Sequence, residues 1–270
     1  MDGQEQGVRI ALCQITSTAD KAANLALVAE QIATAAEQGA RVVVFPESTM
    51  VSVGNPLGEV AEPLDGPWAR TVGELARQHD VLVVVGMYTP AGDGRVRNTQ
   101  LVTGLGMHVG YDKIHLFDAF GFTESSTVAP GTEPLTVTVD GVTFGIATCY
   151  DVRFPELFRA LADKGATVIL LGASWGAGEG KREQWELLVR ARALDSTCWL
   201  LACGQADPLE SGITPPVGAP AGIGYSLVAD PTGHVRASLG AAPELLVVDV
   251  DPDEVVGVRA RIPVLANRRL

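Results

Sequence analysis

The sequence predicts an α/β protein with a mainly parallel sheet. Patterns typical of strands alternate with patterns typical of helices, and several strand patterns are continuous β-branched runs of the kind buried on both faces. The chain has 270 residues, a length at which α/β proteins often remain one unit. No low-complexity segment or composition break divides it, so residues 1–270 are predicted to form a single domain.

The first half of the chain begins with a predicted β-α-β unit. Asp20 is a plausible N-cap for an Ala-rich helix that runs to about Gln38 and is closed by Gly39. A second helix is predicted over Pro67–His79. The strands predicted in this half are Arg9–Ile15, Arg41–Phe45, Val81–Met87, Arg97–Thr103 and Met107–Tyr111.

The second half contains a strong hairpin signal, Asp140-Gly141, between the predicted strands Thr136–Val139 and Val142–Thr148. The Gly- and Pro-rich loop Ser211–Gly224 is too long for a bare connection, so it is expected to be mobile or to shape a site. The other predicted elements are helices Pro155–Lys164 and Glu183–Ser196, strands Ala166–Leu171, Trp199–Ala202, Ile223–Ala229 and Leu245–Val250, and a turn at Asp230–Gly233.

Two segments share one local pattern. Gln38–Val44 and Lys164–Leu170 both run from a helix end through Gly-Ala into a strand. This similarity hints at two related halves that face each other.

Composition excludes several classes of function. The chain is 47% hydrophobic and 19% charged, so it can bury a core and is not intrinsically disordered. Its net charge of −12 disfavours nucleic acid and anionic membranes as partners. The apolar runs are too short to span a bilayer, and the N-terminus lacks the pattern of a signal peptide. Four cysteines without a C-x-x-C pair predict neither a disulfide framework nor a zinc site. A cytoplasmic protein with reduced thiols is expected.

Three reactive side chains each follow a predicted strand: Glu47, Lys113 and Cys149. Ligands of α/β sheets lie beyond the carboxyl ends of strands, so this placement can bring the three together. Cys149 also stands at a strand-to-helix junction that resembles the elbow of a nucleophile. Taken singly, each has a plainer explanation: a buried thiol, a capping carboxylate, or a lysine paired with Asp112 or Asp118. His115 raises a rival Cys–His pairing, although a structural role is expected for it.

The segments around these residues resemble the signature blocks of the nitrilase superfamily of carbon–nitrogen hydrolases. The blocks are Phe45-Pro46-Glu47, Tyr111–Asp118 and Cys149–Glu156, in the family order. Arg190–Asp195 and the ending Ile262–Arg269 agree as well, so the resemblance covers nearly the whole chain.

The resemblance implies a four-layer α-β-β-α sandwich and the hydrolysis of a non-peptide C–N bond. Cys149 is then the nucleophile that forms a thioester, Glu47 the general base, and Lys113 the cation that stabilises the oxyanion, together with the backbone N–H of Tyr150. A second family glutamate falls on Glu124, where it positions Lys113 and the substrate. No metal or organic cofactor is required. Relatives generally form homodimers or larger homo-oligomers, and the apolar and then basic tail can cross to a neighbour.

The sequence indicates the branch of the superfamily less specifically than the superfamily itself. Glu124-Ser125, Ala173–Trp175 and Arg190–Cys198 look most similar to deaminated glutathione amidase and its ω-amidase relatives, which act on amides of 2-oxo acids. The alternatives are ω-amidase activity on 2-oxoglutaramate, another aliphatic amidase, an N-carbamoyl amine hydrolase, and a non-catalytic binding protein that retains the fold. Gln184 departs from the histidine usual before Trp185 in these relatives, which leaves the precise substrate open.

An anionic substrate requires a basic group in an acidic protein. Lys181, Arg182 and Arg153 are the candidates, although Arg153 can equally brace Glu156 or Asp151. Trp175 is expected either in a pocket wall or in ordinary core packing.

Overall fold

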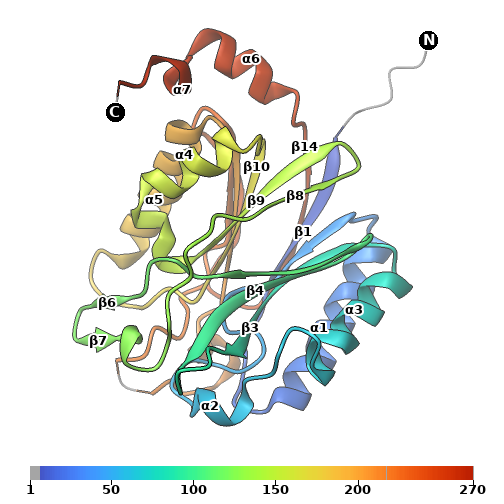
Figure 1. The fold of residues 1–270 in the computed structure, drawn as a ribbon, viewed down its shortest axis with the longest axis vertical. Helices are drawn as coiled ribbons and strands as arrows, with labels where there is room; N and C mark the ends of the chain where they lie inside the picture. Colours follow the sequence, from blue (N-terminus) through green and yellow to red (C-terminus); the bar gives the residue numbers. More distant parts are fainter. Residues whose placement is uncertain (1–6, 217, 270) are drawn as a thin grey trace.

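The computed structural model, which describes residues 7–216 and 218–269, contains two six-stranded sheets packed face to face with helices on both outer faces (Figure 1). This is the four-layer α-β-β-α sandwich. The strands of the first sheet, in spatial order, are β14 (Glu244–Val250), β1 (Val8–Gln14), β2 (Val42–Val44), β3 (Leu82–Pro90), β4 (Val96–Gly104) and β5 (Met107–Asp112). Those of the second are β13 (Val235–Ser238), β12 (Leu227–Ala229), β11 (Trp199–Gly204), β10 (Val168–Ala173), β9 (Val142–Thr148) and β8 (Thr136–Val139).

The two sheets have the same pattern of parallel and antiparallel strands. In the first, β1, β2 and β3 are parallel, with β14 antiparallel on one side and β4 and β5 antiparallel on the other. In the second, β9, β10 and β11 are parallel, with β8 on one side and β12 and β13 on the other, all antiparallel. The two related halves indicated by the helix-Gly-Ala-strand pattern are therefore present. Gly39 and Gly165, which end the corresponding helices, both have the left-handed φ that favours glycine, +80° and +94°.

Helices cover the outer face of each sheet. α1 (Lys21–Glu37) and α3 (Pro67–Gln78) pack on the first sheet, and α4 (Pro155–Asp163) and α5 (Lys181–Ser196) pack on the second (Figure 1). Asp20 is the N-cap of α1, as predicted, because its carboxylate accepts hydrogen bonds from the backbone N–H groups of Ala22 and Ala23 at 2.9 and 3.1 Å. The shorter helices are α2 (Leu57–Val60), α6 (Glu254–Arg261) and α7 (Val264–Asn267).

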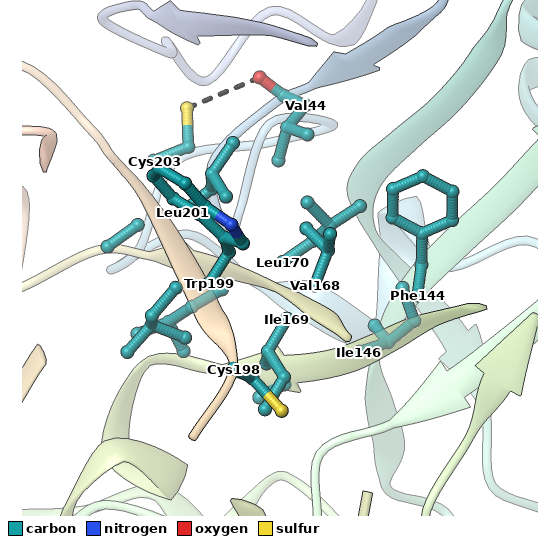
Figure 2. Close-up of a cluster of buried hydrophobic side chains, with 14 of the residues drawn as sticks. Val44, Phe144, Ile146, Val168, Ile169, Leu170, Cys198, Trp199, Leu201 and Cys203 are labelled. Carbon is teal, nitrogen blue, oxygen red and sulfur yellow. Dashed lines mark hydrogen bonds between the residues drawn. The ribbon is translucent and has the colours of Figure 1, made fainter. Parts of the chain in front are cut away.

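The largest core cluster draws side chains from both sheets. Along β1, Ile10 and Leu12 join this cluster, while Ala11 and Cys13 join a second cluster beneath α1 and α3, as alternation in a doubly buried strand requires. Figure 2 shows part of the shared core, where the thiol of Cys203 donates to the backbone carbonyl of Val44 at 3.3 Å across the sheets. The two sheets therefore share one hydrophobic core.

The cysteines have the predicted state. All four are free and buried. The predicted hairpin is also confirmed, because β8 and β9 pair across Asp140-Gly141, and both turn residues have the positive φ of a tight hairpin turn.

Several short elements differ from the sequence predictions. The strand that follows the turn at Asp230–Gly233 is β13, which was not predicted, and β14 pairs with β1 in the other sheet. The two-residue strands β6 (Asp118–Ala119) and β7 (Phe122–Thr123) form a small hairpin that was also not predicted. Such short segments carry too few residues for a periodic signal. The tail forms α7 against α5, and Arg268 pairs with Asp163 at 2.6 Å within the same chain.

None of the helices in residues 7–216 and 218–269 has both the length and the apolar character needed to cross a bilayer.

Candidate active site

Turns at the carboxyl ends of three strands carry the residues predicted to react. Glu47 lies in the turn after β2, and this turn packs directly against Gly86 of β3. A side chain at Gly86 would come within 2.6 Å of the backbone of Pro46 and Ser48, so only glycine permits this approach. Gln205 fixes the same turn, because its side-chain amide donates to the Glu47 backbone carbonyl at 2.9 Å.

Cys149 is the first residue of a short 3₁₀ helix, η2 (Cys149–Arg153), that directly follows β9. Its φ is +44°, a value that costs free energy in a non-glycine residue and that is seen where a nucleophile is exposed on a sharp turn. The predicted elbow is therefore present.

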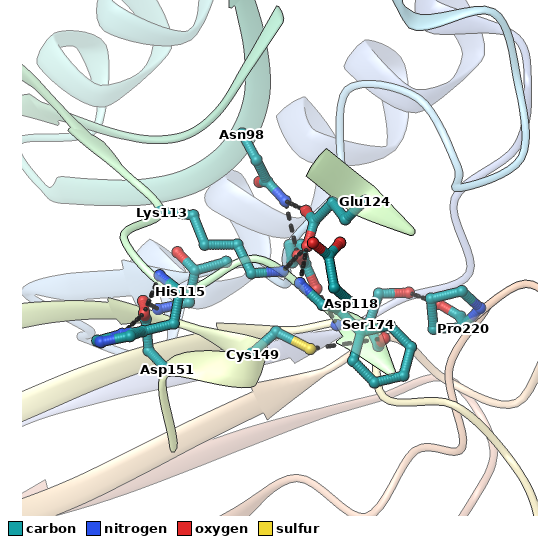
Figure 3. A network of polar contacts seen from close by, with 12 residues as sticks. Asn98, Lys113, His115, Asp118, Glu124, Cys149, Asp151, Ser174 and Pro220 are labelled. Carbon is teal, nitrogen blue, oxygen red and sulfur yellow. Dashed lines mark hydrogen bonds and ion pairs between the residues drawn. The ribbon is translucent and has the colours of Figure 1, made fainter. Parts of the chain in front are cut away.

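Lys113 follows β5 and lies between two carboxylates (Figure 3). Its Nζ is 2.9 Å from Glu47 Oε1 and 2.8 Å from Glu124 Oε2. Glu124 begins a 3₁₀ turn, η1 (Glu124–Ser126), and is only 7% exposed, so its carboxylate is buried beside the Lys113 ammonium. The alternative pairing of Lys113 with Asp112 or Asp118 is wrong.

The charges of this cluster stabilise one another. Burial alone would lower the pKa of Lys113, but the charges of Glu124 and Glu47 outweigh it and hold that pKa well above its usual value. For Glu124, burial is the largest influence and opposes ionisation, yet the charge and hydrogen bonds of Lys113 leave its pKa below the usual value. Lys113 is therefore an ammonium and Glu124 a carboxylate at neutral pH.

The Cys149 thiol faces the same cluster and is 6% exposed. It donates to the Ser174 backbone carbonyl, with an Sγ–O distance of 3.7 Å. Burial, followed by the nearby charge of Glu47, raises the pKa of the thiol well above its usual value, and Lys113 offsets only part of this. The resting nucleophile is consequently a neutral thiol that needs a base.

Two residues that orient the carboxylates were not predicted. Asn98 on β4 donates from Nδ2 to Glu47 Oε1 at 2.7 Å and to Glu124 Oε1 at 3.0 Å. The backbone N–H of Ser174, just after β10, donates to Glu47 Oε2 at 2.8 Å. A sequence signal exists for Asn98, because Asn98 and Gln100 are amides at alternate positions of one predicted strand and therefore lie on the same face of the sheet.

Asp151 joins the lysine segment to the cysteine elbow. Its fully buried carboxylate accepts hydrogen bonds from Tyr111 Oη at 2.7 Å, the His115 backbone N–H at 3.0 Å and the Thr148 backbone N–H at 2.9 Å. His115 Nδ1 is also 2.7 Å from Asp151, and its ring stacks on Phe154 with centroids 3.8 Å apart. His115 therefore has the structural role expected, and the Cys–His pairing gains no support.

Replacing this carboxylate should loosen the site. The Asp151 carboxylate accepts hydrogen bonds at both oxygens. In Asp151→Asn one of these oxygens becomes an NH₂ group, which cannot accept and leaves the donors on that side without a partner. We expect a loss of about 2–3 kcal/mol in the free energy of unfolding, measured by urea titration, with a matching fall in activity. Asp163→Asn, which removes only the exposed pair with Arg268, is the control and should cost under about 1 kcal/mol. Equal losses in both variants would contradict the bridging role of Asp151.

The cluster opens into a cavity of about 320 Å³. Tyr150, Trp175 and Lys181 line it, as does Pro220, which accepts a hydrogen bond from Ser174 Oγ. The loop that carries Pro220 therefore shapes the site, one of the two roles predicted for it. Trp175 also packs against Trp185, at a centroid distance of 5.3 Å, so both expectations for it hold.

The other two cations predicted near the substrate do not line the cavity. Arg153 lies beside the Trp175 ring, 5.1 Å from its centroid, and its Nη2 donates to Gln184 Oε1 at 2.8 Å rather than bracing Glu156 or Asp151. The guanidinium carbon of Arg182 lies over the ring of Tyr225, 3.9 Å from the ring centroid.

No group of three or more His, Cys, Asp or Glu side chains is arranged to hold a metal ion in the described part of the chain.

Three proteins with similar sequences bear on the function of the site. "Hydrolase Rv0480c" of Mycobacterium tuberculosis is 54% identical over 97% of this chain and 95% of its own. A deaminated glutathione amidase of Escherichia coli O157:H7 is 34% identical over 94% of both chains. The mouse omega-amidase NIT2 is 30% identical over 97% of this chain and 95% of its own.

Solved structures share the fold. Saccharomyces cerevisiae Nit3, described as a member of branch 10 of the nitrilase superfamily, has a TM-score of 0.83 at 28% identity, with 98% and 97% of the two chains covered. A glutamate-to-glutamine variant of the Nesterenkonia sp. AN1 amidase, with the acetamide moiety of fluoroacetamide bound covalently at its active-site cysteine, has a TM-score of 0.79 at 26% identity, covering 98% and 95%. The model of the carbon–nitrogen hydrolase family matches residues 9–260. With this match and these relatives, the chain belongs to the carbon–nitrogen hydrolase family of the nitrilase superfamily.

Proposed function

We propose that the protein hydrolyses the C–N bond of a small amide through a thioester on Cys149. The observation that carries the proposal is the buried cluster in which Lys113 bridges Glu47 and Glu124 beside a neutral thiol. It supplies a nucleophile, a base and a cation around one cavity, which are the groups that acyl transfer requires.

In the acylation step, Glu47 takes the proton of Cys149 as Sγ attacks the amide carbonyl carbon. Negative charge then develops on the carbonyl oxygen. Lys113 uses two N–H groups on the glutamates and retains a third for this oxygen. The backbone N–H of Tyr150 is a second donor, since the first N–H groups of a helix have no partner within it. One such donor is worth about 3–4 kcal/mol in the transition state.

Collapse of this intermediate breaks the C–N bond. The leaving nitrogen takes the proton held by Glu47 and departs as ammonia or an amine, which leaves a thioester on Cys149. Glu47 next removes a proton from water, whose oxygen attacks the thioester carbonyl and expels the thiolate. The Cys149 thiol regains its proton and the acid is released. Glu124 holds Lys113 in place throughout, and no step needs a cofactor.

The substrate we favour is deaminated glutathione, with 2-oxoglutaramate as the alternative. Relatives that bear the names deaminated glutathione amidase and omega-amidase support both. The two substrates share a 2-oxoglutaryl acyl group and differ in the leaving amine, so one acyl-enzyme serves either. We assign Trp175 and Lys181 to substrate binding as residues that line the cavity, whereas Arg153 contacts the ring of Trp175 and the amide of Gln184 from outside it.

A substrate panel tests the proposal. Wild type, Cys149→Ala and Cys203→Ala are incubated with deaminated glutathione, 2-oxoglutaramate, an aliphatic amide, an N-carbamoyl amine and a nitrile, and released ammonia or amine is measured. We expect amide turnover in wild type and Cys203→Ala and a loss of at least about 1,000-fold in Cys149→Ala. Failure of wild type on every compound would favour the binding protein, and preference for the carbamoyl amine or nitrile would move the enzyme to another branch.

We further propose a cytoplasmic homodimer. Four free, buried cysteines support a reducing compartment. Leu187 and Leu194 on α5 are 66% and 44% exposed, which supports burial of this helix against a second copy. Light scattering at several protein concentrations measures the mass of the particle in solution, which should be twice the 28.3 kDa of one chain.

A further inference from the structure

Two buried hydroxyls in the cavity wall take no part in the mechanism above. Ser48 is 1% exposed and Tyr88 is 2% exposed, and both line the cavity. Their oxygens lie 2.6 Å apart, and neither hydroxyl forms another hydrogen bond with residues 7–216 or 218–269. Two hydroxyls carry two protons, and the bond between them uses one. The pair therefore has one O–H donor left, and a buried donor without an acceptor is costly.

The fold fixes this pair beside the base. Ser48 directly follows Glu47 and has a φ of +59°, which is uncommon in a residue with a side chain. Such a conformation persists where the surrounding structure enforces it, often at a functional site. Tyr88 lies on β3, and its ring packs with Val96 and Val128 in a small buried cluster. The spare donor is therefore held in place at the cavity wall.

Negative charge near the pair favours a neutral acceptor. After burial, the charge of Glu47 is the largest influence that raises the pKa of Tyr88, and the charge of Glu124 acts in the same direction. Tyr88 is consequently a neutral phenol that keeps its proton. The two glutamates carry two negative charges against the single positive charge of Lys113, so a carboxylate beside the pair is repelled. The acceptor that fits is a neutral oxygen, such as an amide carbonyl.

The pair lies on the side of the scissile bond from which the amine departs. In the proposed mechanism Glu47 returns its proton to the leaving nitrogen, so this nitrogen faces Glu47. Ser48 is the next residue along the chain. Leu57 and Val128 line the cavity as well, and both pack in the cluster that contains Tyr88. A substituent on the leaving nitrogen therefore meets an apolar wall that holds one polar donor.

We propose that the Ser48–Tyr88 pair donates a hydrogen bond to a neutral oxygen on the leaving amine, so that secondary amides with a carbonyl next to the nitrogen-bearing carbon are preferred over those with an alkyl group there. This inference rests on the proposed amidase function. It assigns a recognition element to the part of the substrate that the thioester does not retain.

Two amides with leaving amines of the same shape test the inference. The acid group that is amidated in 2-oxoglutaramate is joined to glycinamide in one compound and to isobutylamine in the other, so two methyl groups replace an oxygen and an NH₂. We expect wild type to have a 10- to 100-fold higher kcat/KM on the glycinamide compound, because a methyl group leaves the buried donor unpaired. In Tyr88→Phe/Ser48→Ala this preference should fall below about threefold, and each single variant, which keeps one hydroxyl, should lose less of it.

Thr89→Val is the matched control. Thr89 is the next residue of β3 and has a buried hydroxyl that lies 3.0 Å from that of Thr99, but it does not line the cavity. Loss of this hydroxyl should leave the preference for the glycinamide compound as it is in wild type. A preference that falls equally in Thr89→Val would mean that altered packing of β3, and not a lost donor, changes the selectivity.

Other outcomes overturn the inference or the function separately. Equal use of the two compounds by wild type, or an unchanged preference in the double variant, would exclude recognition by the pair and leave the amidase intact. If wild type cleaves neither compound nor 2-oxoglutaramate, the proposed function fails. Calorimetry of both compounds with Cys149→Ala, with and without the two hydroxyl substitutions, still tests the inference in that case. Absence of binding, or a preference that survives both substitutions, contradicts it.

Discussion

A Glu47→Gln variant is expected to lose turnover by about 1,000-fold and yet to retain a thiol that alkylating agents modify. Turnover falls because the neutral amide cannot accept the Cys149 proton or activate water, and general-base catalysis is worth about 10²–10⁴-fold. The reactivity of the Cys149 thiol toward alkylating agents should rise while turnover falls. After burial, the charge of Glu47 is the largest influence that raises its pKa, while Lys113 lowers it. Without that charge the pKa falls, and the thiolate is present at lower pH.

The measurement is the rate of iodoacetamide modification between pH 6 and 9 in wild type and Glu47→Gln. The pH at which the modification rate reaches half of its maximum should be lower in the variant than in wild type. Cys149→Ala is the control, because the other three cysteines are fully buried and should not react. An upward shift, or equal loss of turnover and alkylation, would contradict Glu47 as the base.

The positions of the reactive residues could be predicted from the sequence because they follow strands. Val42–Val44 is a fully buried apolar strand and Val142–Thr148 is a mainly buried one. The turn that follows each strand, and with it Glu47 or Cys149, therefore lies at the carboxyl end of a sheet. The duplicated topology was visible only as the pattern Gly39-Ala40 and Gly165-Ala166, since pairing order is a long-range property that local sequence does not encode.

The contacts that hold the site together could not be predicted. Asp151 bonds to Tyr111, 40 residues away, and Asn98 reaches Glu47 across 51 residues. Nothing local distinguishes a buried carboxylate such as Asp151 from a helix-capping one. The three cations near the substrate were equally plausible in sequence, and packing alone separates Lys181 from Arg153 and Arg182.

Removal of the Lys113 ammonium, which lies between Glu47 and Glu124, should lower the free energy of unfolding more than any other substitution considered. In Lys113→Met, Glu47 and Glu124 remain buried and share the amide of Asn98 without a positive charge between them. Breaking a buried ion pair in this way typically costs about 3–5 kcal/mol, and the oxyanion donor is lost as well. We expect a fall of that size in the free energy of unfolding and no detectable turnover, measured by urea titration and ammonia release.

The pH dependence of this loss identifies its cause. In wild type the pKa of Glu124 is lowered, so its contribution to stability is present above the unfolded pKa of about 4.3 and is lost as pH falls through the folded value. In Lys113→Met we expect the carboxylates, which now repel each other, to bind a proton more tightly than in the unfolded chain. The variant should therefore gain stability as pH falls from 7 to 5. Lys113→Met/Glu124→Gln removes one charge of the pair and should recover much of the stability at pH 7 while remaining inactive. A double variant as unstable as Lys113→Met, or an unchanged pH slope, would mean that lost packing rather than charge destabilises the site, because the apolar stem of the lysine is shortened equally in both proteins.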